Sequence, residues 1–68
     1  MDKYTEIIGA DALMPGASRQ DIEAAIDRLA GQAGCEQIIE CLWALKACNT
    51  YGALINLRAA IAAANDAQ

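Results

Sequence analysis

Three runs of apolar residues in this chain repeat at the spacing of an α-helix, and residues that break helices separate them. The clearest run is Ile22, Ile26 and Leu29, whose side chains fall on one face of a helix. Strands favour β-branched and aromatic residues, yet valine and phenylalanine are absent from the 68 residues. The sequence therefore predicts an all-α fold.

Residues 1–17 are expected to form a short helix or an irregular arm. A helix can begin near Lys3, but Gly9, Pro15 and Gly16 interrupt any longer one. The pattern therefore gives this segment no firm helix boundaries.

Three longer helices are expected after this segment. Ser18 lies three residues before Asp21, which is a weaker version of the capping box that starts many helices. A glycine at 31 or 34 is expected to end that first helix. Near Asn49 a straight helix would turn polar residues into its apolar face, so we expect a break with Asn49 or Thr50 as the new N-cap. A kink in one long helix is the alternative. The expected helices cover residues 18–33, 35–48 and 50–64.

Together these helices predict one small domain, 1–68, built as a bundle of three or four helices, or as a helical hairpin if the break is only a kink. A chain this short buries only about 60% of its unfolded surface, so its stability is marginal. Disulfides need paired cysteines and zinc sites usually use histidine, whereas the chain has three cysteines and no histidine. A second copy is the expected support, and the domain is predicted to dimerise through its helices.

The three cysteines lie at the two ends and in the middle of one predicted helix. Separations of six and seven residues correspond to an axial rise of about 9 to 10 Å, which is too far for a disulfide. We expect buried thiols that act as small apolar side chains, with an intermolecular disulfide or a metal contact as alternatives. The predicted core stripe of this helix is Cys35, Ile38, Leu42 and Leu45.

Six residues outside the core stripes are candidates for an interface. Trp43 lies with Ile39 on the flank of the predicted helix, and a large amphipathic ring in that position is typical of interface hot spots. The alternative is that Trp43 caps the end of a small core. The last helix adds a second strip beside the first. The predicted interface residues are Ile39, Trp43, Lys46, Tyr51, Ile55 and Arg58.

Catalysis is not expected, because acids such as Asp21 and Glu40 fall on predicted solvent faces and no histidine can assist them. No catalytic residue, cofactor or metal site is predicted. The stretch Asp11-Ala12-Leu13 is similar to the Asp-Ser-Leu stretch of acyl carrier proteins, but Ala12 replaces the serine that would carry a phosphopantetheine arm.

Nucleic acid is also an unfavourable partner. The formal charge is −4 with only five lysines and arginines, whereas phosphate backbones are bound by cations. The segment Ile22–Leu45 could be arranged as a helix-turn-helix, but its second helix would present Glu36 and Glu40 to DNA. No long uncharged apolar stretch or basic leader is present, so a cytoplasmic protein that neither spans nor binds a membrane is expected.

These observations favour a small acidic protein-binding module that modulates, most simply inhibits, a partner protein. A partner with a basic surface suits its charge. Small acidic proteins of this kind are often encoded by phages or mobile elements, and such an origin is expected here by analogy with their size and charge. A small dedicated chaperone or adaptor subunit is the alternative function, and a helix-turn-helix regulator is the least favoured.

Overall fold

The computed structural model of the chain describes residues 3–66. Within that range every regular element is a helix, which confirms the all-α prediction. The helices are α1 (Lys3–Ile8), α2 (Ala10–Leu13), α3 (Arg19–Leu29), α4 (Glu36–Ala47) and α5 (Tyr51–Asp66).

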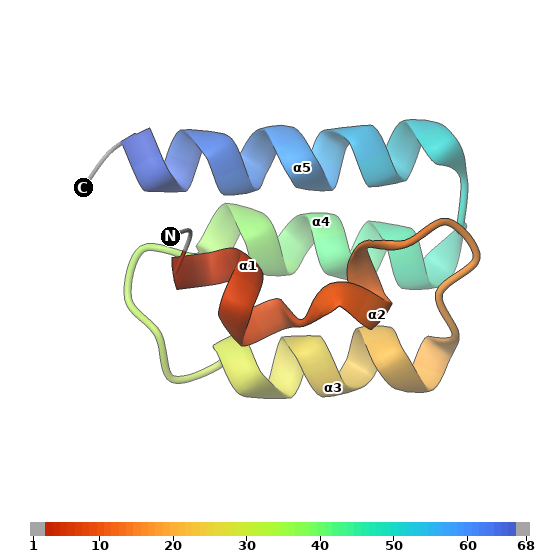
Figure 1. Cartoon of the computed structure of the whole chain (residues 1–68), viewed down its shortest axis with the longest axis horizontal. Coiled ribbons are helices and arrows are strands. Elements are labelled where there is room, and N and C mark those ends of the chain that lie inside the picture. The colour runs from red at the N-terminus through yellow and green to blue at the C-terminus, as the bar shows by residue number, and fades with distance from the viewer. Residues whose placement is uncertain (1–2, 67–68) are drawn as a thin grey trace.

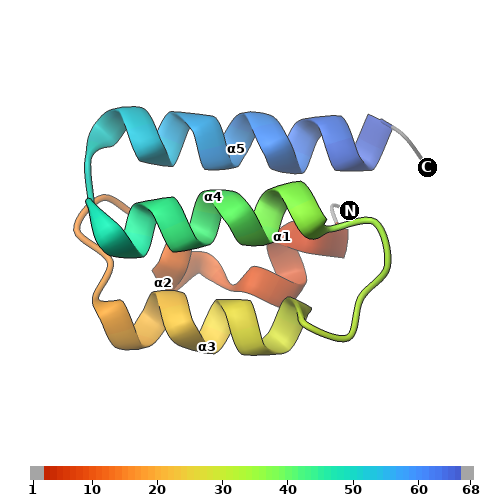
Figure 2. The same ribbon diagram turned by 180° about the vertical axis from the view of Figure 1, so that it is seen from behind.

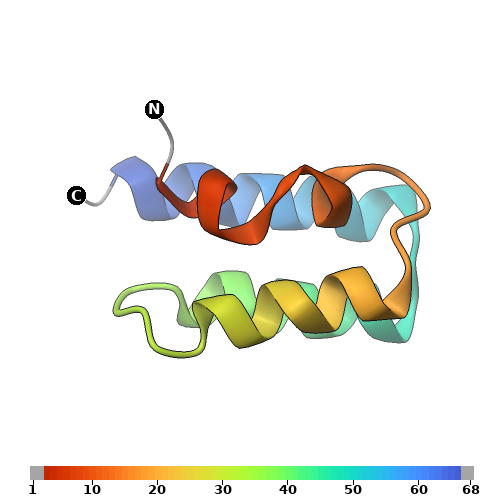
Figure 3. The ribbon, with the colours of Figure 1, turned by 60° about the horizontal axis from the view of Figure 1, so that its bottom comes forward.

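The three long helices lie side by side in alternating directions, and α1 and α2 together take a fourth position (Figure 1). Seen from behind, α4 runs between α5 and α3 (Figure 2). Figure 3 shows α1 and α2 in one layer with α5, over a second layer of α3 and α4. Because α4 packs on α3 and α5, and α1 packs on the same two helices, all four positions surround one core.

The core is apolar throughout the described residues, and no buried polar side chain lacks a hydrogen-bond partner there. The predicted stripe on α4 is confirmed, since its four side chains are each at most 1% exposed. The N-terminal segment, residues 3–17, also contributes side chains to the core, and Tyr4 and Ile8 are both fully buried. The buried residues are Tyr4, Ile8, Ala12, Ile22, Ala25, Ile26, Leu29, Cys35, Ile38, Leu42, Leu45, Leu54, Leu57, Ala60 and Ile61.

A glycine separates the first two helices. The N–H of Gly9 donates to the carbonyl of Thr5 at 2.9 Å, and its φ and ψ of 87° and 151° belong to a region that essentially only glycine enters. A β-carbon at this position would also lie 3.3 Å from Nη2 of Arg28. The segment expected to be a short helix or an irregular arm is therefore two short helices joined at a sharp turn.

Arg28 of α3 holds the end of α1. Its Nε donates to the carbonyl of Ile7 at 2.7 Å, and its Nη2 donates to the carbonyl of Ile8 at 2.6 Å. The last carbonyls of a helix have no partner within the helix, and a cation is favourable beside them. Arg28 thus caps α1 from a neighbouring helix. The hydroxyl of Tyr4 adds a second tie by donating to the carbonyl of Ala33 at 3.3 Å.

Two further side chains fix the rest of the N-terminal segment. Nη2 of Arg58 donates to the carbonyl of Leu13, the last residue of α2, at 3.1 Å. The amide of Asn49 donates to the carbonyl of Ala17 at 2.8 Å and so joins the loop after α2 to the loop before α5. Each long helix, or a loop beside it, therefore contributes to holding residues 3–17.

The capping box predicted at the start of α3 is confirmed. The N–H of Asp21 donates to Oγ of Ser18 at 3.1 Å, and the N–H of Ser18 donates to the Asp21 carboxylate at 3.3 Å. The expected end at residue 33 is wrong, because α3 stops at Leu29. The N–H of Gln32 donates to the carbonyl of Leu29 at 2.9 Å, and the Cys35 thiol donates to the same carbonyl, so a tight turn and a thiol replace the next helical turn.

The chain breaks between α4 and α5, so one long helix over residues 35–64 is ruled out. Cys48 is extended, and Thr50 is the N-cap of α5, with its Oγ1 accepting from the N–H of Ala53 at 3.1 Å. Asn49, the other candidate N-cap, bonds Ala17 instead. α4 covers residues 36–47 against the expected 35–48, and α5 runs to Asp66, two residues past the expected end.

Candidate protein-interaction surface

Trp43 projects from α4 on the side next to α3. Its side chain is 51% exposed although it is the largest apolar residue type in the chain. The ammonium of Lys46 lies 4.8 Å from the centre of the ring, within the range of a cation–π contact. The same ammonium lies 2.9 Å from a carboxylate oxygen of Glu23 on α3. Trp43 is thus held over the groove between the two helices but is not enclosed by it.

Two hollows lie along this groove and share Trp43 and Lys46 as walls. The Asp27 hollow, of about 120 Å³, is completed by Glu23, Ile26 and Asp27. The Arg19 hollow, of about 250 Å³, lies towards the end of α4. We call this surface the Trp43 face, and it consists of Arg19, Glu23, Ile26, Asp27, Trp43, Lys46 and Ala47.

The Trp43 face contains one ion pair and one acidic side chain without an ion-pair partner among residues 3–66. Glu23 and Lys46 neutralise each other, whereas Asp27 has no ion-pair partner among residues 3–66. Glu36 and Glu40 of α4 are also exposed, but they do not line this face, and Glu40 lines the hollow between α4 and α5 instead. The Asp27 hollow therefore combines the ring and the apolar side chain of Ile26 with one unpaired carboxylate, whereas the Arg19 hollow is lined by two cations, Arg19 and Lys46, and by no acid.

The six predicted interface residues do not meet on one surface. Ile39 is half-buried and packs against the core, while Trp43 and Lys46 form the Trp43 face. On α5, Tyr51 and Ile55 are 69% and 48% exposed. We call this pair the α5 strip.

The two exposed areas lie on opposite flanks of the α4–α5 pair. A shallow hollow lined by Cys41 and Ala44 of α4 and by Ala53 and Asn56 of α5 separates them. The expectation of adjacent strips on successive helices is therefore wrong, because Trp43 turns towards α3 while the α5 strip turns away from α4.

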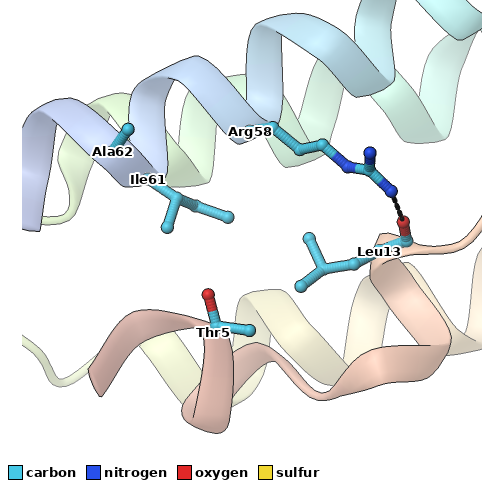
Figure 4. A pocket seen from close by; sticks show the side chains of 5 residues that line it. All are labelled: Thr5, Leu13, Arg58, Ile61 and Ala62. Carbon is cyan, nitrogen blue, oxygen red and sulfur yellow. Dashed lines mark hydrogen bonds between the residues drawn. The ribbon is translucent and has the colours of Figure 1, made fainter. Parts of the chain in front are cut away.

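Arg58, the sixth predicted residue, has a structural contact that its place in the sequence did not indicate. It lines a hollow of about 310 Å³ between the N-terminal segment and α5, with Thr5, Leu13, Ile61 and Ala62 as the other walls. Figure 4 shows its guanidinium turned to the Leu13 carbonyl at the edge of this hollow. Because Leu13 lies 45 residues away in the chain, no local pattern could have revealed the contact.

The cysteines differ sharply in accessibility. Cys35 is buried, and its thiol donates to the carbonyls of Leu29 and Gln32 at 3.2 and 3.0 Å. Burial, followed by the neighbouring charge of Glu36, raises the pKa of the Cys35 thiol. Cys41 is half-buried and Cys48 is exposed, and all three are free thiols. Of the three, only Cys35 has the fully buried packing position expected for them all.

Residues 3–66 bring together no group of three or more histidine, cysteine or acidic side chains that could hold a metal ion. Among the same residues, no helix combines the length and the apolar character required to cross a membrane.

Comparison with known proteins gives no identification. No protein-family model matches the chain, and neither a curated protein nor a solved structure is significantly similar to it.

Proposed function

We propose that the chain is a non-catalytic protein-binding module that modulates a partner by covering part of its surface with the Trp43 face. The observation that carries this proposal is the half-exposed indole of Trp43 between two hollows. Tryptophan is enriched among the few residues that supply most of the binding energy at protein interfaces. Inhibition is the simplest effect of such covering, and the dedicated chaperone or adaptor is the alternative use of the same face.

The proposal also includes a cytoplasmic location, a partner other than nucleic acid, and a phage or mobile-element origin. The reduced state of three free thiols suits the cytoplasm, and the acidic surface disfavours nucleic acid as the partner. A phage or mobile-element origin would fit a small inhibitor of a host protein.

An affinity capture tests the proposal. Immobilised wild type, Trp43→Ala and Tyr51→Ala are exposed to extract from the cell of origin, and the bound proteins are quantified by mass spectrometry. We expect a partner whose recovery falls at least tenfold with Trp43→Ala and is unchanged with Tyr51→Ala, both variants being helical by circular dichroism. An identical set of captured proteins for all three would refute a role for the Trp43 face.

Self-association is a separate proposal that rests on the α5 strip. Ile55 is followed on the same helix face by the exposed small residues Ala59 and Ala62, a four-then-three spacing that suits close packing of two helices. We expect a homodimer by light scattering at micromolar concentration, with or without reductant, which Ile55→Ser converts to a monomer. Trp43→Ala should leave the dimer intact. A wild-type monomer, or a dimer lost on adding reductant, would refute this interface.

A further inference from the structure

We propose that the hollow between the N-terminal segment and α5 binds a small carboxylic acid with an apolar chain, whose carboxylate pairs with Arg58. The inference goes beyond the proposed function, because this hollow lies between α1, α2 and α5, in the layer opposite to the Trp43 face (Figure 3). Three observations carry it: the size of the hollow, its apolar walls, and a guanidinium at its edge that no acid neutralises.

The hollow has the size of a small organic molecule. Its volume of about 310 Å³ corresponds to about ten waters, at about 30 Å³ for each water of the liquid. Ligand pockets in proteins usually range from about 300 to 1,000 Å³, so this hollow lies at the lower limit of that range. One side chain of a partner would leave much of it empty, whereas an eight-carbon acid has about as many non-hydrogen atoms as the hollow holds waters.

Apolar groups from three helices form the walls. The side chains of Leu13 on α2 and Ile61 on α5 approach each other across the hollow, with Ala62 beside Ile61 and Thr5 of α1 on the facing wall (Figure 4). A hydrocarbon chain placed between them is removed from water together with the walls that it covers, which is favourable in proportion to the apolar area. The walls therefore select a ligand with an apolar body.

Among the lining residues, only Arg58 is charged. Its guanidinium forms no ion pair within residues 3–66, and its Nη2 donates to the Leu13 carbonyl at 3.1 Å, which fixes it at the edge of the hollow. Because Nη2 carries a second N–H, one complete edge of the guanidinium is left with two parallel donors. Such an edge matches the two oxygens of a carboxylate, which arginine binds in a bidentate manner.

The charge of the whole protein limits the charge of the ligand. At a formal charge of −4 the protein repels anions in general, so Arg58 has to overcome this repulsion locally. A ligand with several negative charges would meet more repulsion and find no second cation in the lining. A monocarboxylate is therefore the expected class, and a fatty acid of medium length combines one carboxylate with an apolar chain.

The test uses octanoate as the probe, titrated into ¹⁵N-labelled protein. Octan-1-ol and octylammonium are control ligands with the same hydrocarbon chain and a neutral or a positive head, and butyrate is a control with a shorter chain. General attraction to an acidic protein favours octylammonium. A preference for octanoate over both therefore reports the local charge of Arg58.

We expect saturable binding of octanoate with a dissociation constant of about 1 mM, as for a small ligand in an open site. Amide shifts should centre on Thr5, Leu13, Arg58 and Ala62, and the fluorescence of Trp43, the one tryptophan of the chain, should not change. Octan-1-ol should bind at least about fivefold more weakly because it lacks the charge. Butyrate should bind at least about tenfold more weakly because it buries fewer methylene groups.

Two variants with matched controls locate the site. Arg58→Gln should weaken octanoate binding at least about fivefold, whereas Arg19→Gln removes the same charge from an exposed position outside the hollow and should leave binding nearly unchanged. Ala62→Leu fills the hollow from its wall and should abolish binding. Ala63→Leu adds the same atoms at the next exposed position, which does not line the hollow, and should not affect binding.

All four variants should be helical by circular dichroism. Ala62 is also part of the proposed dimer contact, so the comparison of Arg58→Gln with Arg19→Gln decides the outcome if Ala62→Leu changes the mass measured by light scattering.

Non-specific binding of amphiphiles to exposed apolar side chains would overturn the inference. It predicts equal binding of octanoate and octan-1-ol, amide shifts around Trp43 and Tyr51, and no effect of Arg58→Gln. Absence of shifts up to about 20 mM octanoate would overturn the inference as well. Because the hollow is separate from the Trp43 face, either result would leave the proposed protein interaction, and its affinity capture, unaffected.

Discussion

The N-terminal segment and the Trp43 face use charged and aromatic side chains in opposite ways. In the N-terminal segment the ring of Tyr4 is fully buried and Arg28 is committed to the carbonyl end of a helix. On the Trp43 face the ring is half-exposed, and Lys46 pairs locally with Glu23 across a groove that stays open. Side chains of the same chemical kind therefore build the fold in one region and remain available to a partner in the other.

This contrast also limits what a change in either region can do. Substitutions in the N-terminal segment should lower the free energy of unfolding, because they remove contacts between helices. Substitutions on the Trp43 face should lower binding and cost less stability than substitutions that remove those contacts.

Gly9→Ala should be the most damaging single change. An alanine must enter a backbone region that costs about 1 to 3 kcal/mol, and its β-carbon would press on the Arg28 guanidinium 3.3 Å away. We expect the free energy of unfolding, measured in urea, to fall by about 2 to 4 kcal/mol. Gly31→Ala is the matched control, since Gly31 has no positive φ and no atom close to its would-be β-carbon. An equal loss in both variants would contradict the special role of Gly9.

Arg28→Ala removes both hydrogen bonds to the end of α1. Hydrogen bonds to a charged group contribute about 1.5 to 3 kcal/mol, and partial exposure reduces that value here. We expect a loss of about 2 to 3 kcal/mol, with faster amide hydrogen exchange in α1. Arg19→Ala deletes the same side chain from a surface position at the start of α3, so it should be neutral or slightly stabilising. Unchanged exchange in α1 would show that Arg28 does not hold it.

Arg58→Ala should have a smaller effect of the same kind. One exposed hydrogen bond to Leu13 is lost, which corresponds to about 0.5 to 1.5 kcal/mol. Arg58 is also one of the predicted interface residues, so this variant separates a role in the fold from a role in binding. We expect no loss of captured partner despite the lower melting temperature. Partner binding that disappears in Arg58→Ala, with the fold intact, would restore the interface role.

The raised pKa of the Cys35 thiol gives a pH-dependent test, with a smaller expected effect, of the role of buried Cys35 in the fold. Because the folded protein raises this pKa, the unfolded chain loses the thiol proton first as pH rises. The stability that Cys35 contributes is therefore full below the ordinary thiol pKa, roughly pH 8.5, and declines above it. Cys35→Ala should flatten this decline relative to wild type in urea unfolding across pH 7.5 to 10. A steeper decline in the variant would show that the sign is wrong.

The sequence predicted those parts of the structure that depend on neighbours along the chain. The capping box of Ser18 and Asp21 and the buried stripe from Cys35 to Leu45 follow from local spacing. The end of α3 was misplaced, because the Leu29 carbonyl, which a further turn would offer to the N–H of Ala33, accepts from Gln32 and Cys35 instead, and Tyr4, 29 residues away, holds the Ala33 carbonyl. Periodicity carries no information on contacts of that length.

For the candidate site too, the sequence predicted what depends on one helix and missed what depends on how two helices are placed. A tryptophan outside a sufficient core stripe signalled exposure, and Trp43 is exposed. The expected union of Trp43 with Tyr51 and Ile55 failed because the facing of two helices depends on the loop between them. The bond from Asn49 to Ala17, 32 residues apart, helps to set that loop and has no counterpart in the local pattern.

The most direct test of the division between the two regions is the free energy of unfolding of Trp43→Ala, determined in urea beside wild type. We expect a loss of about 1 to 2 kcal/mol, because half of the ring is already in water and only its covered half loses contacts. A loss of about 3 kcal/mol or more, the usual result for a core tryptophan, would mean that Trp43 serves the fold and would contradict its assignment to a partner.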